Sequence, residues 1–339
     1  MDERIRSILN DEPLIANREK WFSEMNDLFY GDRKSALHLA GMGGDAAHPE
    51  LMYSDPEVWM EEALGFLAEH AYSRISDKYF VPLCVYNSVY GVHFVDRIFG
   101  CEVFFQDGQW YNRYLKNEVG QLQKPNLENN ETWALAKRIA LAFLDWNVSA
   151  PVFEMPVIAS PLNIAVNLYG EEILVAMLMD PEAAHHDLKI INEVLVELHQ
   201  WYRSHIPARQ LQPVVSTGRC QPPEHGQICG CTSQLLSPGL YEEFIMPLDD
   251  ALLGVYPHGG MIHLCGSHTQ LIPLFAKMPH LKCVQLNDKA AEDLKFYAEG
   301  LRDDQVIYLN PCEGMSTRQA LQIAGDRKMV IVYGYEEDA

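Results

Sequence analysis

The sequence predicts an α/β protein, a (β/α)8 TIM barrel with an N-terminal helical extension. Three observations favour this fold. A chain of 339 residues suits a barrel that forms one unit. Its apolar fraction of 48% is sufficient for a large core. Eight short apolar runs alternate with longer amphipathic segments, which is typical of strands separated by helices. A doubly wound open sheet is the alternative fold.

Residues 1–79 are expected to form the helical extension, and residues 80–339 the barrel. The run "DPEVWMEEALGFLAEHAYSRI" at 55–75 begins with Asp-Pro and spaces its apolar residues three and four apart, as an amphipathic helix does. The "GMGGD" run at 41–45 only superficially resembles a phosphate loop, because no clear strand frames it and it lacks a third glycine and the P-loop lysine.

Eight runs are the candidate barrel strands: "FVPLCVY" (80–86), "CEVFF" (101–105), "PVFEMPVI" (151–158), "GQICG" (226–230), "GMIHLC" (260–265), "KCVQLN" (282–287), "QVIYLN" (305–310) and "MVIVYG" (329–334). A long helix is expected between Asp180 and Ile206, opened by Asp-Pro and closed by Pro207. A ninth run, "LQPVVSTG" at 211–218, could be the true fourth strand with "GQICG" as its extension, or the arm of a hairpin.

Charge and cysteine usage limit the partners and the compartment. Lys and Arg total 26 against 47 Asp and Glu, and the resulting net charge of −21 repels nucleic acids and anionic membrane surfaces. Neither an apolar signal core nor a run of 18 apolar residues is present, so we expect a soluble cytoplasmic protein. The eight cysteines are therefore expected to be reduced.

The segment "GMIHLCG" raises the question of a metal site. His263 and Cys265 are two residues apart on a predicted strand, so their side chains point to the same side. Zinc binds imidazole nitrogen and thiolate sulfur, and a catalytic zinc needs three protein ligands. The alternative is that both side chains are simply part of a core. Cys312, at a neighbouring strand end, favours the metal, and so do Cys229 and Cys231, although "CGCTS" could equally be a tight turn.

Other polar residues fall at predicted strand ends, where barrel enzymes place their reacting groups. We expect catalytic roles for Glu154, Glu313 and Tyr335, and substrate contacts from Tyr86, Asn87, Asn287, Asp288 and Asn310. Glu154 could instead pack at the barrel rim. The adjacent His185 and His186 are expected on a solvated helix face. A hydrolase is disfavoured because no G-x-S-x-G motif is present.

Three segments together resemble the uroporphyrinogen decarboxylase superfamily. They are "LSPGLYEEFIMPLDDALLGVYPHGGMIHLCGSHTQLIPLFAKMPHLKCVQLND" (236–288), "VIYLNPCEGMSTRQALQIA" (306–324) and "VIASPLNIAVNLYGEEILVAMLMDPEAAHHDLKIINE" (157–193). The resemblance extends over roughly residues 80 to 335 and is specific in the combination of its motifs. It implies one of two activities, cofactor-free decarboxylation or methyl transfer with corrinoid proteins through a zinc-bound thiolate.

The methyltransferase branch is the better match. The decarboxylases grip their substrate with an arginine-rich N-terminal motif, whereas the corresponding region here reads "VPLCVYNSVYG". His263 and Cys265 match the zinc ligands of the methyltransferases. The family's third ligand follows the last strand, but this chain has Tyr335 there and ends four residues later, without the usual closing helix. Cys312, or alternatively Cys229 or Cys231, would then supply the third ligand; a set including Glu313 or Tyr335, or no metal, are the other possibilities.

The resemblance therefore implies a zinc-dependent methyltransferase that acts on a small molecule. Its methyl donor would be methylcobalamin on a corrinoid protein, or a small molecule, and the family suggests a homodimer. One alternative is a cofactor-free decarboxylase of a uroporphyrinogen-like or small carboxylic acid. Another is a non-catalytic subunit that binds a metal or a corrinoid for a partner.

Overall fold

The protein has a mixed α/β fold with two parallel sheets. The computed structural model describes residues 2–40, 48–214 and 218–333. Six strands form one parallel sheet in the order β1 (Leu37–Ala40), β11 (Met329–Tyr333), β10 (Val306–Leu309), β9 (Leu281–Leu286), β8 (Gly260–Leu264) and β7 (Gly226–Cys229). Three others form the second, in the order β2 (Cys84–Val85), β5 (Val152–Glu154) and β6 (Leu211–Gln212). A parallel bridge between Leu39 and Phe80 links β1 to the residues that lead into β2.

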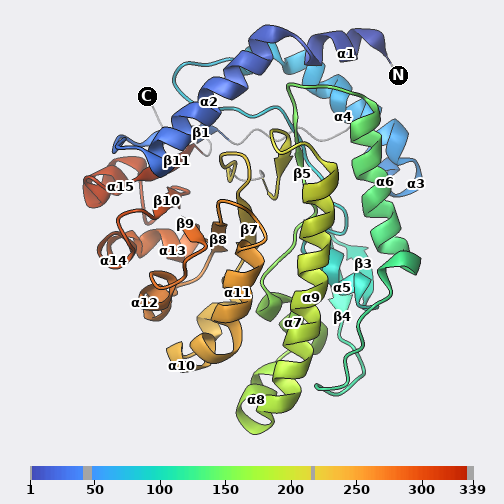
Figure 1. The fold of residues 1–339 in the computed structure, drawn as a ribbon, viewed down its shortest axis with the longest axis vertical. Coiled ribbons are helices and arrows are strands. Elements are labelled where there is room, and N and C mark those ends of the chain that lie inside the picture. The colour runs from blue at the N-terminus through green and yellow to red at the C-terminus, as the bar shows by residue number, and fades with distance from the viewer. Residues whose placement is uncertain (1, 41–47, 215–217, 334–339) are drawn as a thin grey trace.

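Helices surround these strands (Figure 1). The longer ones are α1 (Glu3–Leu9), α2 (Glu12–Tyr30), α4 (Pro56–His70), α6 (Glu131–Asp145), α7 (Pro161–Tyr169), α8 (Glu172–Met179), α9 (Pro181–His205), α11 (Met246–Leu253), α14 (Leu294–Gly300) and α15 (Thr317–Ala324). The short ones are α3 (Leu51–Ser54), α5 (Phe94–Ile98), α10 (Pro238–Leu240), α12 (Ile272–Phe275) and α13 (Asp288–Glu292). Asp55 and Asp180 cap α4 and α9 by accepting hydrogen bonds from Val58 N and Ala183 N, so both predicted Asp-Pro helix starts are confirmed.

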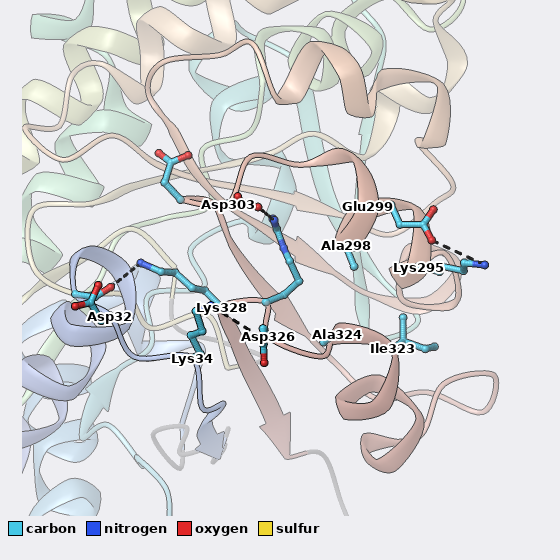
Figure 2. A pocket seen from close by; sticks show the side chains of 13 residues that line it. Asp32, Lys34, Lys295, Ala298, Glu299, Asp303, Ile323, Ala324, Asp326 and Lys328 are labelled. Carbon is cyan, nitrogen blue, oxygen red and sulfur yellow. Dashed lines mark hydrogen bonds and ion pairs between the residues drawn. The ribbon is translucent and has the colours of Figure 1, made fainter.

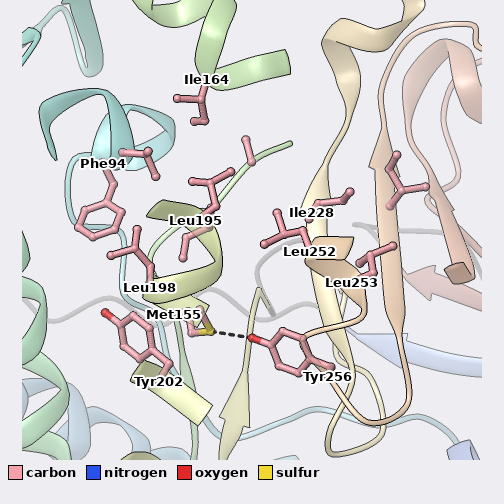
Figure 3. Close-up of a cluster of buried hydrophobic side chains, with 14 of the residues drawn as sticks. Phe94, Met155, Ile164, Leu195, Leu198, Tyr202, Ile228, Leu252, Leu253 and Tyr256 are labelled. Carbon is pink, nitrogen blue, oxygen red and sulfur yellow. Dashed lines mark hydrogen bonds between the residues drawn. The ribbon is translucent and has the colours of Figure 1, made fainter. Parts of the chain in front are cut away.

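The buried residues form two clusters on opposite faces of the strands. Alternate residues such as Met261, Cys283, Val306, Tyr308 and Val330 belong to an inner cluster. Their neighbours Ile262, Val284, Ile307 and Ile331 belong to an outer cluster that includes the helices. Figure 3 shows the part of the outer cluster that α7, α9 and α11 contribute to. Period-two alternation therefore gives each strand one inward and one outward face.

Helix α2 closes one end of the inner cluster. Its residues Trp21, Phe22, Met25, Leu28 and Phe29 pack among the inward-facing strand residues. Lys328, which immediately precedes β11, donates hydrogen bonds to the carbonyl oxygens of Phe29 (3.1 Å) and Gly31 (3.0 Å). This helix therefore lies at the end where the strands begin and leaves their C-terminal ends available for a site.

Two strand predictions were wrong. The run "CEVFF" is not a barrel strand, because β3 (Glu102–Gln106) pairs antiparallel with β4 (Gln109–Arg113) in a separate hairpin. Asp107 and Gly108 both have positive φ (49° and 79°) in the two-residue connection, as a type I′ hairpin turn requires. Strand β1 was missed, since the residues around it were assigned to a helical extension; it pairs with β11. Both members of the ambiguous pair are strands, β6 beside β5 and β7 beside β8, each parallel to its neighbour.

Among the described residues, no single helix combines the length and apolar character needed to cross a membrane. Only α7 and α8 taken together meet that criterion, and they are bent by 109° relative to each other.

Candidate functional site

Strand pairing brings two of the sequence motifs together. Cys229 is the last residue of β7 and lies opposite His263 in the parallel register with β8. Gly230 N donates a hydrogen bond to His263 O (2.9 Å), which extends this pairing beyond the strand end. Cys231 then begins a short 3-10 helix, Cys231–Leu235. The motifs "ICGC" and "IHLC" therefore meet at the C-terminal ends of adjacent strands.

Three side chains converge there closely enough to hold a metal ion. The ligand atoms of Cys229, Cys231 and His263 all lie within 4.8 Å of one another, and the two sulfur atoms are 3.6 Å apart. Cys265 Sγ lies 3.0 Å from His263 Nε2. One imidazole with several thiols is a donor set that zinc prefers. We call these four residues the thiol cluster.

The imidazole of His263 is held by a buried amide. Gln285, on the adjacent strand β9, is in hydrogen-bond contact with His263 Nδ1 through Oε1, and its Nε2 donates to Asn310 Oδ1 (2.7 Å). An amide oxygen can only accept, so Nδ1 carries the proton and the lone pair of Nε2 faces the thiols. Metal-ligating histidines commonly have such a partner on the other ring nitrogen.

The loop between the two cysteines depends on Gly230. A Cβ at this position would lie 2.5 Å from Ile262 Cδ1, so the backbone packs more tightly against β8 than a side chain would permit. Ser233 Oγ donates to Gly230 O (2.6 Å), and Ser160 N donates to Cys229 O (2.9 Å). These bonds fix the backbone that carries the thiols on both sides of the glycine.

A partly buried cation lies beside the thiol cluster. Arg219 Nη2 is 3.3 Å from His263 Nε2, and Nη1 is 3.2 Å from the amide oxygen of Gln227 when that amide is oriented to satisfy both of its neighbours. Hydrogen bonding to the Cys231 thiol lowers the pKa of both Cys229 and Cys265, and the charge of Arg219 lowers both further. The pKa of Cys231 is raised by the same hydrogen bonds, because its proton is shared with its neighbours.

Cys312 lies apart from this group. It forms an isolated bridge with Met315, and its Sγ contacts the carbonyl oxygen of Asp288 at 3.7 Å. Among the described residues, the group whose ligand atoms converge contains Cys229 and Cys231, the alternates from the sequence, together with His263. Tyr335 lies outside the described residues.

The remaining predicted residues are distributed around the strand ends. Asn287 Nδ2 donates to Asp288 Oδ2 (3.1 Å) just after β9, and Glu313 is exposed. Glu154 ends β5 and is only 3% exposed. Its charge acts on Arg219.

Tyr86 and Asn87 follow β2. Burial raises the pKa of Tyr86 well above its usual value. Asn87 is fully buried, and its Nδ2 has no partner among the described atoms.

Sequence reasoning missed Arg219, Gln227 and Gln285. The sequence did contain a signal for the two glutamines, because each is a polar residue at an inward-facing position of an otherwise apolar strand. Gln227 is two residues from Cys229, and Gln285 is two residues from Cys283. Arg219 offered no comparable pattern, since it lies in a loop between β6 and β7.

A pocket lies at the opposite end of the strands (Figure 2). It has a volume of about 800 Å³ and is lined by residues from the segment before β1, from α14 and from the turn between α15 and β11. Several of its charged side chains are paired with each other, for example Arg327 with Asp303 (2.9 Å) and Lys295 with Glu299 (3.9 Å). The pocket therefore belongs to a different end of the molecule from the thiol cluster.

Comparison with known proteins identifies a shared fold. No family model matches the sequence, and no curated protein matches it. A solved structure of a methyltransferase from Methanosarcina mazei superimposes with a TM-score of 0.64 at 11% sequence identity, covering 91% of this chain and 90% of that one. At this identity the likeness establishes the fold.

Proposed function

We propose that the protein is a zinc-dependent methyltransferase built on a closed (β/α)8 barrel. The observation that carries this proposal is the convergence of Cys229, Cys231 and His263 at the C-terminal ends of two adjacent strands, where barrel enzymes place their active sites. The fold shared with the Methanosarcina mazei methyltransferase supports it.

The residues present suit a catalytic zinc. Cys229, Cys231 and His263 would hold it, with Cys265 beside them. Zinc bound there would act as a Lewis acid on the heteroatom that gives or receives the methyl group. Gln285 keeps the proton of His263 on Nδ1, and Arg219 offsets the negative charge of the thiolates.

The proposal also includes a substrate and a methyl donor. A small molecule would enter at the strand ends, where Glu154, Tyr86 and Asn87 would orient it. The methyl group would come from a corrinoid protein or from a small methylated compound. The active form would be a homodimer.

Elemental analysis of protein purified without chelator tests the metal site. We expect about one zinc per chain, and its loss in His263→Ala, Cys229→Ala and Cys231→Ala. Cys312→Ala is the matched control, because its thiol lies outside the converging group. An equal loss of zinc in Cys312→Ala would mean that Cys312 belongs to the ligand set. A parent protein that takes up no zinc would overturn the proposal.

The position of Cys265 beside His263 favours a second candidate function, that of a structural metal site. If all four members of the thiol cluster bound one zinc, its tetrahedral shell would be closed, as in structural sites. The protein would then be a non-catalytic metal-binding subunit. Cobalt substitution separates the two, because the absorption bands of an open site shift when a small thiol is added, whereas those of a closed site do not.

A further inference from the structure

The thiol cluster contains a sulfur pair prearranged to form a bond. Cys229 Sγ and Cys231 Sγ lie 3.6 Å apart, in hydrogen-bond contact. Both are partly exposed, whereas Cys84, Cys101, Cys220 and Cys283 are buried in the core. A small oxidant can therefore reach this pair, and closing the bond requires only a short movement of the two sulfur atoms.

The backbone between the two cysteines is fixed in this arrangement. Gly230 N donates to His263 O and Gly230 O accepts from Ser233 Oγ, and the side chain of Ile262 occupies the space that a Cβ at position 230 would need. The chain therefore holds the two thiols together before any reaction occurs. Much of the entropy cost of bringing two reacting groups together is then already met in the folded state.

We propose that Cys229 and Cys231 form a reversible disulfide that switches the metal site off. A peroxide oxidises one thiol to a sulfenic acid, and the O–O bond breaks with release of one water molecule. The second thiol displaces the hydroxyl group as a second water, and the S–S bond forms. Overall, two thiols lose two electrons and two protons to one peroxide. A small thiol reverses the reaction by two exchange steps.

The regulatory consequence rests on the proposed function, but the disulfide itself does not. Disulfide sulfur is not the thiolate that zinc requires, so oxidation removes two of the three converging ligands. Conversely, bound zinc occupies both sulfur atoms and protects them. Cys265 also contacts the Cys231 thiol and lies 3.0 Å from His263 Nε2, but it follows β8 and is not held to Cys231 through Gly230, so we assign it no part in the bond.

Treatment of chelator-stripped protein with hydrogen peroxide tests the disulfide. We expect the loss of two free thiols per chain and a mass decrease equal to two hydrogen atoms. A glutamate-specific protease cleaves after Glu224 and Glu242, and the peptide between these sites contains Cys229 and Cys231 and no other cysteine, so the modified peptide identifies the pair. Cys312→Ser should react as the parent does, because this cysteine also is partly exposed but lies outside the cluster.

Cys231→Ser and, as an independent variant, Cys229→Ser should each lose the reaction. Unchanged thiol loss in both, or a bond joining Cys231 to Cys265, would overturn the inference. Preloading with zinc separates the two proposals. If the parent protein binds zinc but peroxide produces no disulfide, the inference is overturned and the proposed function stands. A disulfide that forms equally fast with zinc present leaves only the disulfide, without its effect on a metal site.

Discussion

His263 and Gln285 lie on adjacent strands and share a hydrogen bond in which Nδ1 of the imidazole donates to the amide oxygen. The amide cannot rotate freely, because its nitrogen donates to Asn310 Oδ1 (2.7 Å). Asn310, which directly follows β10, therefore orients the amide on β9, and this amide orients the imidazole on β8. We infer that Gln285 is a positioning residue for the metal site.

Replacing Gln285 with leucine is expected to weaken zinc binding by about 10-fold to 100-fold. Leucine accepts no hydrogen bond, so the imidazole loses the partner that keeps its proton on Nδ1. Competition titration with a chromophoric chelator measures the affinity, and ¹⁵N NMR of the histidine ring reports which nitrogen is protonated.

Two further variants distinguish positioning from general damage. Gln285→Glu retains an acceptor for the Nδ1 proton of His263, so its affinity for zinc should stay within about a few-fold of that of the parent. Gln305→Leu removes another buried glutamine, which bonds to Phe275 O and Leu281 O away from the cluster. Equal loss of zinc affinity in Gln305→Leu and Gln285→Leu would contradict the positioning role.

Zinc should stabilise the folded protein by mass action. A ligand that binds only the folded state adds about 2.7 kcal/mol at a free concentration 100 times its Kd. We expect the parent and Cys312→Ala to melt at a higher temperature with zinc than with chelator, and His263→Ala to melt at the same temperature in both. Differential scanning calorimetry measures this, and stabilisation of His263→Ala equal to that of the parent would place the metal elsewhere.

Helix α2 should be necessary for the stability of the inner cluster. Phe22 is fully buried and packs edge-on against Phe80, with ring centroids 6.0 Å apart. Phe22→Ala is expected to reduce the free energy of unfolding by about 3–5 kcal/mol, whereas the exposed Ser23→Ala should change it by less than about 0.5 kcal/mol. Urea denaturation measures both, and similar values for the two would show that α2 is not part of the core.

The sequence predicts the parallel strands well where apolar runs are long. All six predicted strands from "PVFEMPVI" onward appear in the two sheets, as β5 and β7 to β11, because apolar residues on both the inward and the outward face give a clear apolar signal. Strand β1 was not predicted, because "LHLA" is only four residues long and lies between a polar segment and a glycine-rich one. The run "CEVFF" forms a hairpin instead of a barrel strand, and the Asp-Gly pair at 107–108, two residues after it, is the local signal for that turn.

The site was only partly readable from the sequence. The i, i+2 spacing correctly indicates that His263 and Cys265 lie close together. Which strand end supplies the other thiols depends on strand order and register, and these are not local properties. Parallel pairing of β7 with β8 brings Cys229 opposite His263, whereas Cys312 follows β10 and contacts Asp288 instead. The contribution of Arg219 likewise depends on the path of a loop.

A last prediction concerns Asp249, a fully buried carboxyl group that accepts hydrogen bonds from Ser160 Oγ (2.7 Å) and Tyr241 OH (2.9 Å). Burial raises the pKa of Asp249 to about 7, and the two hydroxyl groups offset only part of that effect. Between its ordinary value of 3.8 and about 7, the folded protein therefore holds a proton that the unfolded chain has released. The stability that this proton contributes is complete below that window and is lost as the pH rises through it.

Asp249→Asn removes this dependence, because the amide is neutral at every pH and can still bond to both hydroxyl groups. The free energy of unfolding of the parent, minus that of the variant, should fall with pH by at most about 1.4 kcal/mol per unit until it levels off above about pH 7. Urea denaturation at about pH 5, 6, 7 and 8 measures this difference, and other titrating groups largely cancel in it. Asp27→Asn, at an exposed position, is the matched control for the substitution itself. A difference that stays level from about pH 5 to 8 would mean that Asp249 is already ionised in the folded protein across this range, so that its two hydroxyl partners offset most of the effect of burial.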